Sequence, residues 1–319
     1  MLKFWNSVAE ELGAGRLVFL AVVVGHQKGS PGTARAQLML TDSGESSGTI
    51  GGGIMEARLL DEARGALKNG SMKPVLRVLH HKTTDALETS GLICGGAQSL
   101  VTVVLDSESR MLVDGVVDRL RRGKSGSLLF SATGLTLEDE DLEQPSVSVA
   151  NSGETWTARL GLLNRQRVLI VGCGHCGSAL ATQMVILGYD VIVIEQRTDL
   201  PSLSALPEGV CLLQQPFSEV GQGLDHVGLT FAVVMTPSYP DDVDALANLL
   251  PQAFPFIGVM GSPVKLKKIK DELQIRGFGE SDWSRVTAPV GLPIESDTPA
   301  EIAVSIAAQI LHETKRFGF

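Results

Sequence analysis

The chain has 319 residues, of which 44% are hydrophobic and 20% are charged, and its formal net charge is −9. This length predicts about two globular domains, and the acidic balance argues against a partner nucleic acid or membrane surface, because both need basic patches. Four cysteines in so long a chain do not make a disulfide framework, so we expect reduced thiols and a cytoplasmic location.

The first half of the chain predicts an α+β domain over residues 1–162. Its first long apolar run, 17–24, is too short to span a bilayer and is typical of a buried strand. Hydrophobic periodicity predicts helices at 2–12, 54–68 and 107–122. It predicts further strands at 35–41, 47–50, 75–80 and 100–105. The polar, turn-rich stretch 121–158 predicts a small β region with strands near Leu128 and Ser146, followed by a linker near 162–166.

The first glycine motif of this half opens the helix predicted at 54–68. It consists of Gly51, Gly52 and Gly53, with Glu56 in the first helical turn. Successive glycines let a ligand approach the backbone, and a helix N-terminus favours an anion. The same glycines suit a tight strand-to-helix corner equally well, so both interpretations stay open.

A second glycine motif, Cys94-Gly95-Gly96, precedes the strand predicted at 100–105. A cysteine beside two glycines is sterically accessible, and its thiolate is a ligand for a soft metal or a partner in sulfur transfer. Against this, most free cysteines are buried and behave as small hydrophobic residues. The residues alone therefore favour the inert interpretation.

The clearest fold signal follows the predicted linker. Two β-branched apolar runs, 168–171 and 191–194, flank a stretch with helical spacing. The turn after the first run reads G-x-G-x-x-G and is made of Gly172, Gly174 and Gly177. Glu195 ends the second run, close to the spacing of about 20 residues at which a carboxylate holds a nucleotide ribose. The pattern predicts a Rossmann-like, doubly wound parallel sheet over residues 163–319.

The rest of the second domain follows the same alternation of strands and helices. Further strands are predicted at 210–214, 231–235, 256–260 and 285–288. Helices are predicted at 178–187, 241–250, 263–276 and 299–315. The last helix has a capping box made of Thr298 as N-cap, Pro299 at the first helical position and Glu301 at the third.

The G-x-G-x-x-G turn directs backbone N–H groups and a helix N-terminus at one spot, which suits a phosphate or pyrophosphate. The same glycines would also be kept for packing in a Rossmann domain that has lost its ligand. His175 is the only histidine in this turn, and it joins the glycines and Glu195 as a candidate cofactor-binding residue. Cys173 and Cys176 form a C-x-x-C pair there, which is more typical of small fillers than of a redox site.

One predicted helix, 263–276, is rich in lysine, with Lys265, Lys267, Lys268 and Lys270. Such a run is typical of a solvated helix face. The chain has no His-Glu-x-x-His or Walker motif, and no motif places a general base for hydride transfer.

These glycine motifs, in this order and with a Rossmann-like domain second, resemble the xanthine dehydrogenase accessory protein family, XdhC/CoxI. In the first half the resemblance rests on GSPGTARAQLML, SGTIGGGIMEARLLDEA and GLICGGAQSLVTVV. In the second it rests on VLIVGCGHCGSAL, GVMGSPVKLKKIKDEL and APVGLPIESDTPAEIAVSIAAQIL. The chain departs from the family pattern at Pro237, where we expect histidine, and at Glu295, where we expect glycine.

The resemblance implies a chaperone and insertion factor for the molybdenum cofactor, carried as molybdopterin or its dinucleotide form, rather than an enzyme. It implies a xanthine dehydrogenase-type molybdenum hydroxylase as client and a cysteine desulfurase as partner, and it leaves a homodimer open. The phosphate-bearing tail of that cofactor suits the glycine turns, and molybdenum, a soft centre, suits Cys94 as ligand. The alternative hypothesis is an NAD(P)-dependent oxidoreductase that uses the G-x-G-x-x-G turn and Glu195. A regulatory module with a vestigial Rossmann domain is a third.

Overall fold

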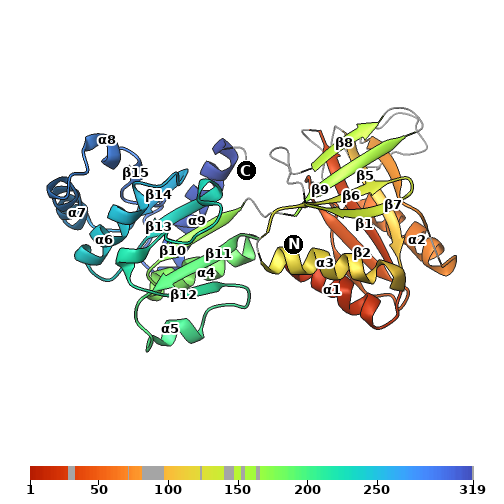
Figure 1. Cartoon of the computed structure of the whole chain (residues 1–319), viewed down its shortest axis with the longest axis horizontal. Helices are drawn as coiled ribbons and strands as arrows, with labels where there is room; N and C mark the ends of the chain where they lie inside the picture. Colours follow the sequence, from red (N-terminus) through yellow and green to blue (C-terminus); the bar gives the residue numbers. More distant parts are fainter. Residues whose placement is uncertain are drawn as a thin grey trace. The chain divides into compact units, whose positions relative to one another are not determined.

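The computed structural model describes residues 1–27, 33–70, 72–80, 97–122, 124–139, 147–151, 155–162 and 166–317. The chain divides into two compact units, Met1–Leu163 and Asn164–Phe319 (Figure 1). The first unit is α+β, and the second has a parallel sheet flanked by helices, which confirms the predicted fold class. In the described parts of the chain, no helix combines the length and the hydropathy that crossing a bilayer requires.

An antiparallel sheet in the order β3-β2-β1-β5-β4 forms the centre of the first unit. Its strands are β1 (Val18–His26), β2 (Gln37–Thr41), β3 (Ser46–Gly48), β4 (Val75–His80) and β5 (Ala97–Leu105). Side chains alternate between the two faces of β1, with Leu20 and Val22 in one core cluster and Phe19 and Ala21 in the other. Because both faces are covered, every residue from 18 to 24 is buried, as the unbroken apolar run predicts.

Helices and a second sheet cover these two faces. Helix α2 (Gly53–Lys68) packs on one face. Helix α1 (Leu2–Gly13), the 3₁₀ turn η1 (Ser107–Ser109) and helix α3 (Arg110–Arg121) belong to the other side, where α1 and α3 lie side by side (Figure 1).

A four-stranded antiparallel sheet in the order β7-β6-β9-β8 shares the core of α1 and α3. Its strands are β6 (Ser127–Ser131), β7 (Gly134–Glu138), β8 (Val147–Asn151) and β9 (Trp156–Gly161). The sequence predicts β6 and β8, whereas β7 and β9 are additional. Both are short, and apolar residues alternate with polar ones over only two or three positions in each.

The second unit has six parallel strands in the order β12-β11-β10-β13-β14-β15. They are β10 (Arg167–Val171), β11 (Asp190–Glu195), β12 (Cys211–Gln214), β13 (Thr230–Val234), β14 (Phe256–Val259) and β15 (Val286–Thr287). This is the doubly wound order of a Rossmann fold, in which the direction of winding reverses between the first and fourth strands. The reversal here lies between β10 and β13, whose carboxyl ends therefore flank the crevice in which such folds bind ligands.

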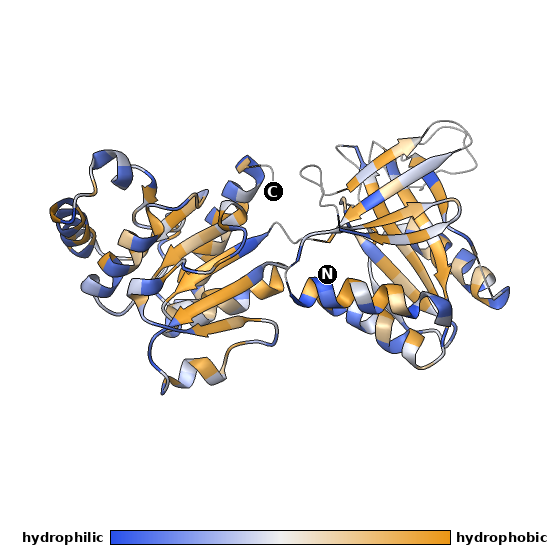
Figure 2. Cartoon of the chain, in the orientation of Figure 1, coloured by the Kyte–Doolittle hydropathy of each residue, from blue (hydrophilic) through white to orange (hydrophobic). Residues whose placement is uncertain are grey.

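Helices pack on both faces of this sheet, which separates two core clusters. Helices α4 (His175–Ile186) and α9 (Pro299–Phe317) share one cluster, and α6 (Tyr239–Leu249) and α7 (Pro263–Ile275) share the other. The remaining helical segments are α5 (Pro201–Ser204), η2 (Phe217–Glu219), η3 (Val227–Leu229) and α8 (Glu280–Trp283). Figure 2 shows the apolar strands between these helices, as expected for a parallel sheet buried on both faces.

Candidate ligand-binding site

The three glycines of the G-x-G-x-x-G turn have different surroundings. A Cβ on Gly172, whose φ is +103°, would lie 2.7 Å from the carbonyl oxygen of Met235. A Cβ on Gly177 would lie 2.0 Å from the carbonyl oxygen of Gly172. A Cβ on Gly174 would meet nothing within 4 Å. The first and third glycines are therefore required by backbone packing, while Gly174 faces open space at the start of α4.

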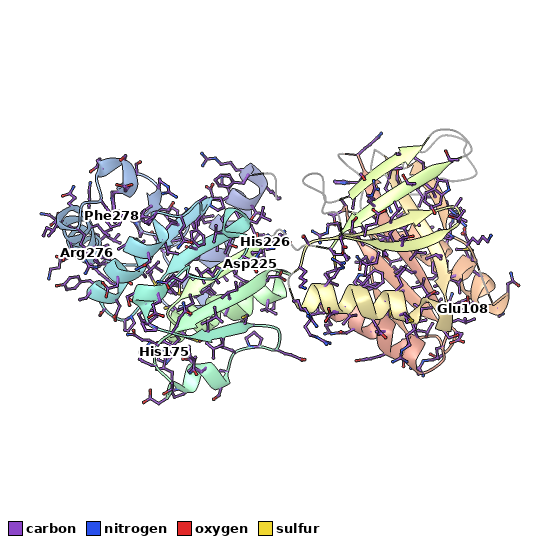
Figure 3. All side chains as sticks on the ribbon, viewed as in Figure 1. Glu108, His175, Asp225, His226, Arg276 and Phe278 are labelled. Atoms are coloured by element: carbon purple, nitrogen blue, oxygen red, sulfur yellow. The ribbon has the colours of Figure 1, made fainter. Side chains whose placement is uncertain are left out.

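The start of α4 lies three residues earlier than predicted, at His175, with Gly174 as its N-cap. His175 is exposed on this first turn (Figure 3). No side chain caps the helix, and its first turn contains no acidic residue. The first N–H groups of a helix have no carbonyl partner within it, so this end of α4 can donate hydrogen bonds to an anion.

Glu195 is fully buried behind the turn, with 0% of its side chain exposed. Its Oε2 accepts hydrogen bonds from the backbone N–H of Cys173 at 2.8 Å and from Nη2 of Arg197 at 2.8 Å. Its Oε1 accepts from the backbone N–H and from Nε of Arg197, at 3.0 Å and 2.9 Å. Burial raises the pKa of Glu195, but the hydrogen bonds from Arg197 and Cys173 outweigh it, so the net pKa is lowered. Oε2 thus braces the glycine turn through Cys173, while Arg197 holds both carboxylate oxygens in place.

The two cysteines of the turn have the environment of structural residues. Cys173 is fully buried in a core cluster, and its carbonyl oxygen accepts a hydrogen bond from the hydroxyl of Ser202 on α5. Burial and the neighbouring Glu195 carboxylate raise the pKa of the Cys173 thiol, and burial raises the pKa of Cys176. Since the thiolate is the reactive form, these shifts oppose a redox role at neutral pH.

A buried ion pair lies on the other side of the crevice, at the carboxyl end of β13. Asp242, on α6, has 0% of its side chain exposed, and its Oδ2 lies 2.5 Å from Nζ of Lys265 on α7. Its Oδ1 accepts hydrogen bonds from the backbone N–H and the hydroxyl of Thr236, at 3.1 Å and 2.6 Å. Burial raises the pKa of Asp242 above its usual value, although Lys265 and Thr236 oppose this shift. Lys265 also donates from Nζ to the carbonyl oxygen of Thr236 at 3.3 Å.

The sequence reasoning missed this pair, because the lysines of α7 predict a solvated face. Ser238 and Ser262 cap α6 and α7 and so fix where each helix begins beyond its strand. Asp242 and Lys265 lie in the first turns of those helices, near the carboxyl ends of β13 and β14. A charged residue in the first turn of the helix that follows a parallel strand is the signal that could have identified them.

In the first unit, the glycine motif 51–53 folds around Glu56. Oε2 of Glu56 accepts hydrogen bonds from the hydroxyl of Thr49 at 2.6 Å, the N–H of Ile50 at 2.9 Å and the N–H of Gly52 at 3.1 Å. Burial raises the pKa of Glu56, but these hydrogen bonds outweigh it and lower the pKa below its usual value. The chain's own carboxylate therefore takes these loop donors at the N-terminus of α2.

Positive φ angles explain why this motif uses glycine. Gly51, Gly52 and Gly53 have φ angles of +124°, +72° and +72°, which other residues rarely adopt. The carbonyl oxygen of Ile50 accepts a hydrogen bond from Nε2 of Gln98 at 3.4 Å, which ties the loop to β5. Cys94, Gly95 and Gly96 lie outside the described residues, so their role stays a prediction.

In the described ranges, no group of three or more histidine, cysteine, aspartate or glutamate side chains is arranged to hold a metal ion. The structure brings together Gly172, Gly174, His175, Gly177 and Glu195 at the predicted turn, and adds Lys265 and Asp242 across the crevice. It brings Gly51, Gly52, Gly53 and Glu56 together separately, in the first unit.

Comparisons with known proteins cover both units. The family model described as the XdhC Rossmann domain matches residues 168–310, and the model of the XdhC and CoxI family matches residues 12–79. The chain is 25% identical over 286 residues to the uncharacterized protein YqeB of Escherichia coli K12, covering 89% of this chain and 41% of that protein. It is 31% identical over 156 residues to a Bacillus subtilis 168 protein described as a probable xanthine dehydrogenase subunit, covering 48% of this chain and 44% of that protein. The chain thus spans less than half the length of these curated relatives.

A solved structure has the same fold. A Bacillus halodurans chain described as a xanthine dehydrogenase superimposes with a TM-score of 0.74 at 21% identity, covering 99% of this chain and 96% of that one. The match extends over both units, as do the two family models. The order of glycine motifs, the Rossmann-like sheet and these matches lead to one conclusion: the chain belongs to the xanthine dehydrogenase accessory protein family, XdhC/CoxI.

Proposed function

We propose that this protein binds the molybdenum cofactor as cargo and delivers it to a xanthine dehydrogenase-type molybdenum hydroxylase. Membership of the XdhC/CoxI family supports an accessory role, and one relative is itself called a probable xanthine dehydrogenase subunit. The observation that carries the proposal is the glycine turn at the switch point, where Gly174 leaves an open approach to the N-terminus of α4.

The cargo fits this turn through its tail. Molybdopterin ends in a phosphate and its dinucleotide form contains a pyrophosphate, and both are anions that a helix N-terminus binds well. Gly172 and Gly177 would shape the turn, Gly174 would let the phosphate approach, and His175 on the exposed first turn of α4 would border it. Binding of the cofactor by these contacts requires no catalytic acid, base or nucleophile.

The molybdenum end calls for a soft ligand, and we assign it to Cys94 on the strength of the family resemblance. A cysteine desulfurase would supply the sulfur for the terminal sulfido ligand while the carrier holds the cofactor. The thiols of Cys173 and Cys176 are less suited, because burial raises the pKa of both.

The alternative, an NAD(P)-dependent oxidoreductase, is not favoured. An enzyme of this fold that uses NAD holds the ribose hydroxyls with the carboxylate at the end of its second strand. Here Glu195 is fully buried. Its Oε2 accepts hydrogen bonds from Cys173 and Arg197, and its Oε1 accepts two from Arg197. A ribose could reach Glu195 only by displacing hydrogen bonds that Arg197 or Cys173 already makes to it.

The proposal is tested by purifying the full chain anaerobically from cells that make the molybdenum cofactor. Small molecules released from it are identified by mass spectrometry, and the loaded protein is added to a cofactor-free xanthine dehydrogenase-type hydroxylase. We expect a pterin that contains molybdenum, and hydroxylase activity that depends on the added protein. A protein that releases NAD(P) and leaves the hydroxylase inactive would contradict the proposal and favour the oxidoreductase.

A further inference from the structure

The buried ion pair at the carboxyl end of β13 has no role in the function proposed above. We propose that Lys265 is the cationic residue of the anion site at the Gly172–Gly177 turn, and that Asp242 holds its ammonium group in place. The ligand class is a phosphate monoester or a pyrophosphate. The proposal rests on the site named under the proposed function and deepens it by adding a binding residue from another helix.

Lys265 and the glycine turn meet at one residue, Thr236. Nζ of Lys265 lies 3.3 Å from the carbonyl oxygen of Thr236. On the other side, a Cβ on Gly172 would lie 3.1 Å from Cα of Thr236. Lys265 therefore extends from α7, beyond β14, to the end of β13, which is one of the two strands that flank the switch point. Its ammonium group lies beside the crevice rather than on the outer face of α7.

The contacts of Asp242 place its carboxylate against the ammonium group of Lys265. Its Oδ1 is fixed by the N–H and the hydroxyl of Thr236, so the plane of the carboxylate is set and Oδ2 is directed at Nζ of Lys265. A buried carboxylate–ammonium pair is a poor source of stability, because desolvation offsets the attraction between the charges. A pair of this kind in a ligand crevice is instead a marker of a functional site.

The side chain of Lys265 is partly exposed to solvent. It is 23% exposed, whereas the side chain of Asp242 is 0% exposed. An ammonium group has three N–H donors. The described residues supply one hydrogen-bond acceptor, the carbonyl oxygen of Thr236, and one ion-pair partner, Oδ2 of Asp242. A donor therefore remains for a ligand oxygen, and a hydrogen bond between two charged groups is among the strongest in proteins.

The neighbouring lysine Lys267 provides a matched control. It lies on the same helix, two residues further on, and it is exposed. A Lys267→Met change removes the same charge from the same helix without touching Asp242 or Thr236. Lys265→Met alone would leave the Asp242 carboxylate buried without its partner and could unfold the protein. The lysine is therefore removed in an Asp242→Asn background, where no charge is left behind.

The experiment titrates the full chain with inorganic pyrophosphate, and separately with inorganic phosphate, in an isothermal titration calorimeter. We expect wild type and Lys267→Met to bind equally well. Asp242→Asn should bind more weakly than wild type, because the ammonium group of Lys265 is no longer held in place. Adding Lys265→Met to Asp242→Asn should weaken binding by about ten- to a hundredfold, as expected for losing one hydrogen bond to a charged group. Adding Lys265→Arg instead should retain most of the affinity. Thermal unfolding of each variant shows that the protein is folded.

Two results would overturn the proposal. One is a folded Asp242→Asn, Lys265→Met protein that binds both probes as tightly as Asp242→Asn does. The other is a wild-type protein that binds neither probe. The first result leaves the carrier function untouched, because the glycine turn can hold a phosphate without Lys265. The second would also remove the glycine turn as the tail site, whereas cofactor loading is measured separately by mass spectrometry. Conversely, a protein without that cargo can still bind pyrophosphate through Lys265.

Discussion

Among single residues, the glycines of the turn after β10 have different roles: Gly174 is expected to matter for ligand binding, and Gly172 and Gly177 for folding. Gly174 has φ near −68° and open space where its side chain would be, so Gly174→Val is compatible with the fold. Its side chain would occupy the approach to the N-terminus of α4. We expect Gly174→Val to stay folded, with a loss of about 1 kcal/mol because valine is a poor N-cap, and to lose most of its affinity for pyrophosphate. Thermal unfolding and calorimetry measure the two effects.

The control for this change is Gly177→Ala, three residues away. A Cβ there would lie 2.0 Å from the carbonyl oxygen of Gly172, so the turn has to shift, at a cost of about 2 kcal/mol or more in the free energy of unfolding. If Gly174→Val binds pyrophosphate as wild type does, the turn has only a structural role.

The cysteines give a second prediction at this scale. Cys94→Ala should retain its thermal stability but copurify with less molybdenum cofactor and activate the client hydroxylase poorly, because a soft metal centre loses a thiolate ligand. Cys173→Ala with Cys176→Ala should leave cofactor content unchanged, although emptying the buried site at Cys173 will lower stability slightly. Metal analysis of the purified proteins measures the difference. Normal cofactor loading of Cys94→Ala, together with failed loading of the double variant, would show that Cys94 is not the thiol that retains the cofactor.

At the scale of elements, two carboxylates hold the two described glycine loops in shape. Glu195 accepts from the turn after β10, and Glu56 accepts from the loop before α2. In each case the acid lies at or near the N-terminus of a helix, where the helix dipole and the loop N–H groups stabilise a negative charge. The two loops are held by the same kind of contact, but only Glu56 lies in the first turn of the helix that its loop precedes. The N-terminus of α4 remains open.

The role of Glu195 predicts a dependence of stability on pH. Its pKa is lowered in the folded chain, so its contribution is complete above the unfolded pKa of about 4.3. The contribution is lost as the pH falls further, through the folded value. Glu195→Gln should therefore lower stability at pH 7 by about 2 kcal/mol, since a buried charged hydrogen-bond network is broken. The difference from wild type should shrink toward pH 3.

Thermal unfolding of wild type and Glu195→Gln at pH 7, pH 5 and pH 3 measures this dependence. Glu208→Gln is a suitable control, because Glu208 is exposed and has no hydrogen bond among those that brace the turn. A stability difference for Glu195→Gln that stays constant from pH 7 to pH 3 would contradict the bracing role.

At the scale of the whole molecule, the sequence predicts the fold well where the signal is local. The strand before Gly172, the capping box at Thr298 and the apolar run of β1 are each determined by adjacent residues, and the structure has each of them. Strands β7 and β9 were missed, because their burial depends on a core shared with α1 and α3. Lys265 and Asp242 are distant in sequence, and only the sheet order brings them to one crevice.

Glu195 is a residue that the sequence placed correctly, at the end of a strand, but whose contacts it did not predict. Its spacing from Gly172 matches that of a ribose-binding acid, but spacing does not reveal which groups the carboxylate contacts. Arg197, two residues further on, supplies three of its four hydrogen bonds, and the fourth comes from the glycine turn itself. A pattern of residue types predicted the fold here and left the function of the acid undetermined.

The last prediction concerns turnover by the intact chain. A dehydrogenase needs a nicotinamide cofactor held by its ribose and a group that takes the substrate proton. Here the acid that would hold the ribose is buried and braces the turn, and no sequence motif places a base. We therefore expect no sustained NAD(P)H formation when the protein is incubated with NAD(P) and simple alcohols, hydroxy acids or purines, followed by absorbance at the nicotinamide band. The control is the same protein preparation added to a cofactor-free hydroxylase, where purine oxidation should appear. Steady NAD(P)H formation without the hydroxylase, abolished by Gly174→Val, would instead establish an oxidoreductase and refute the carrier function.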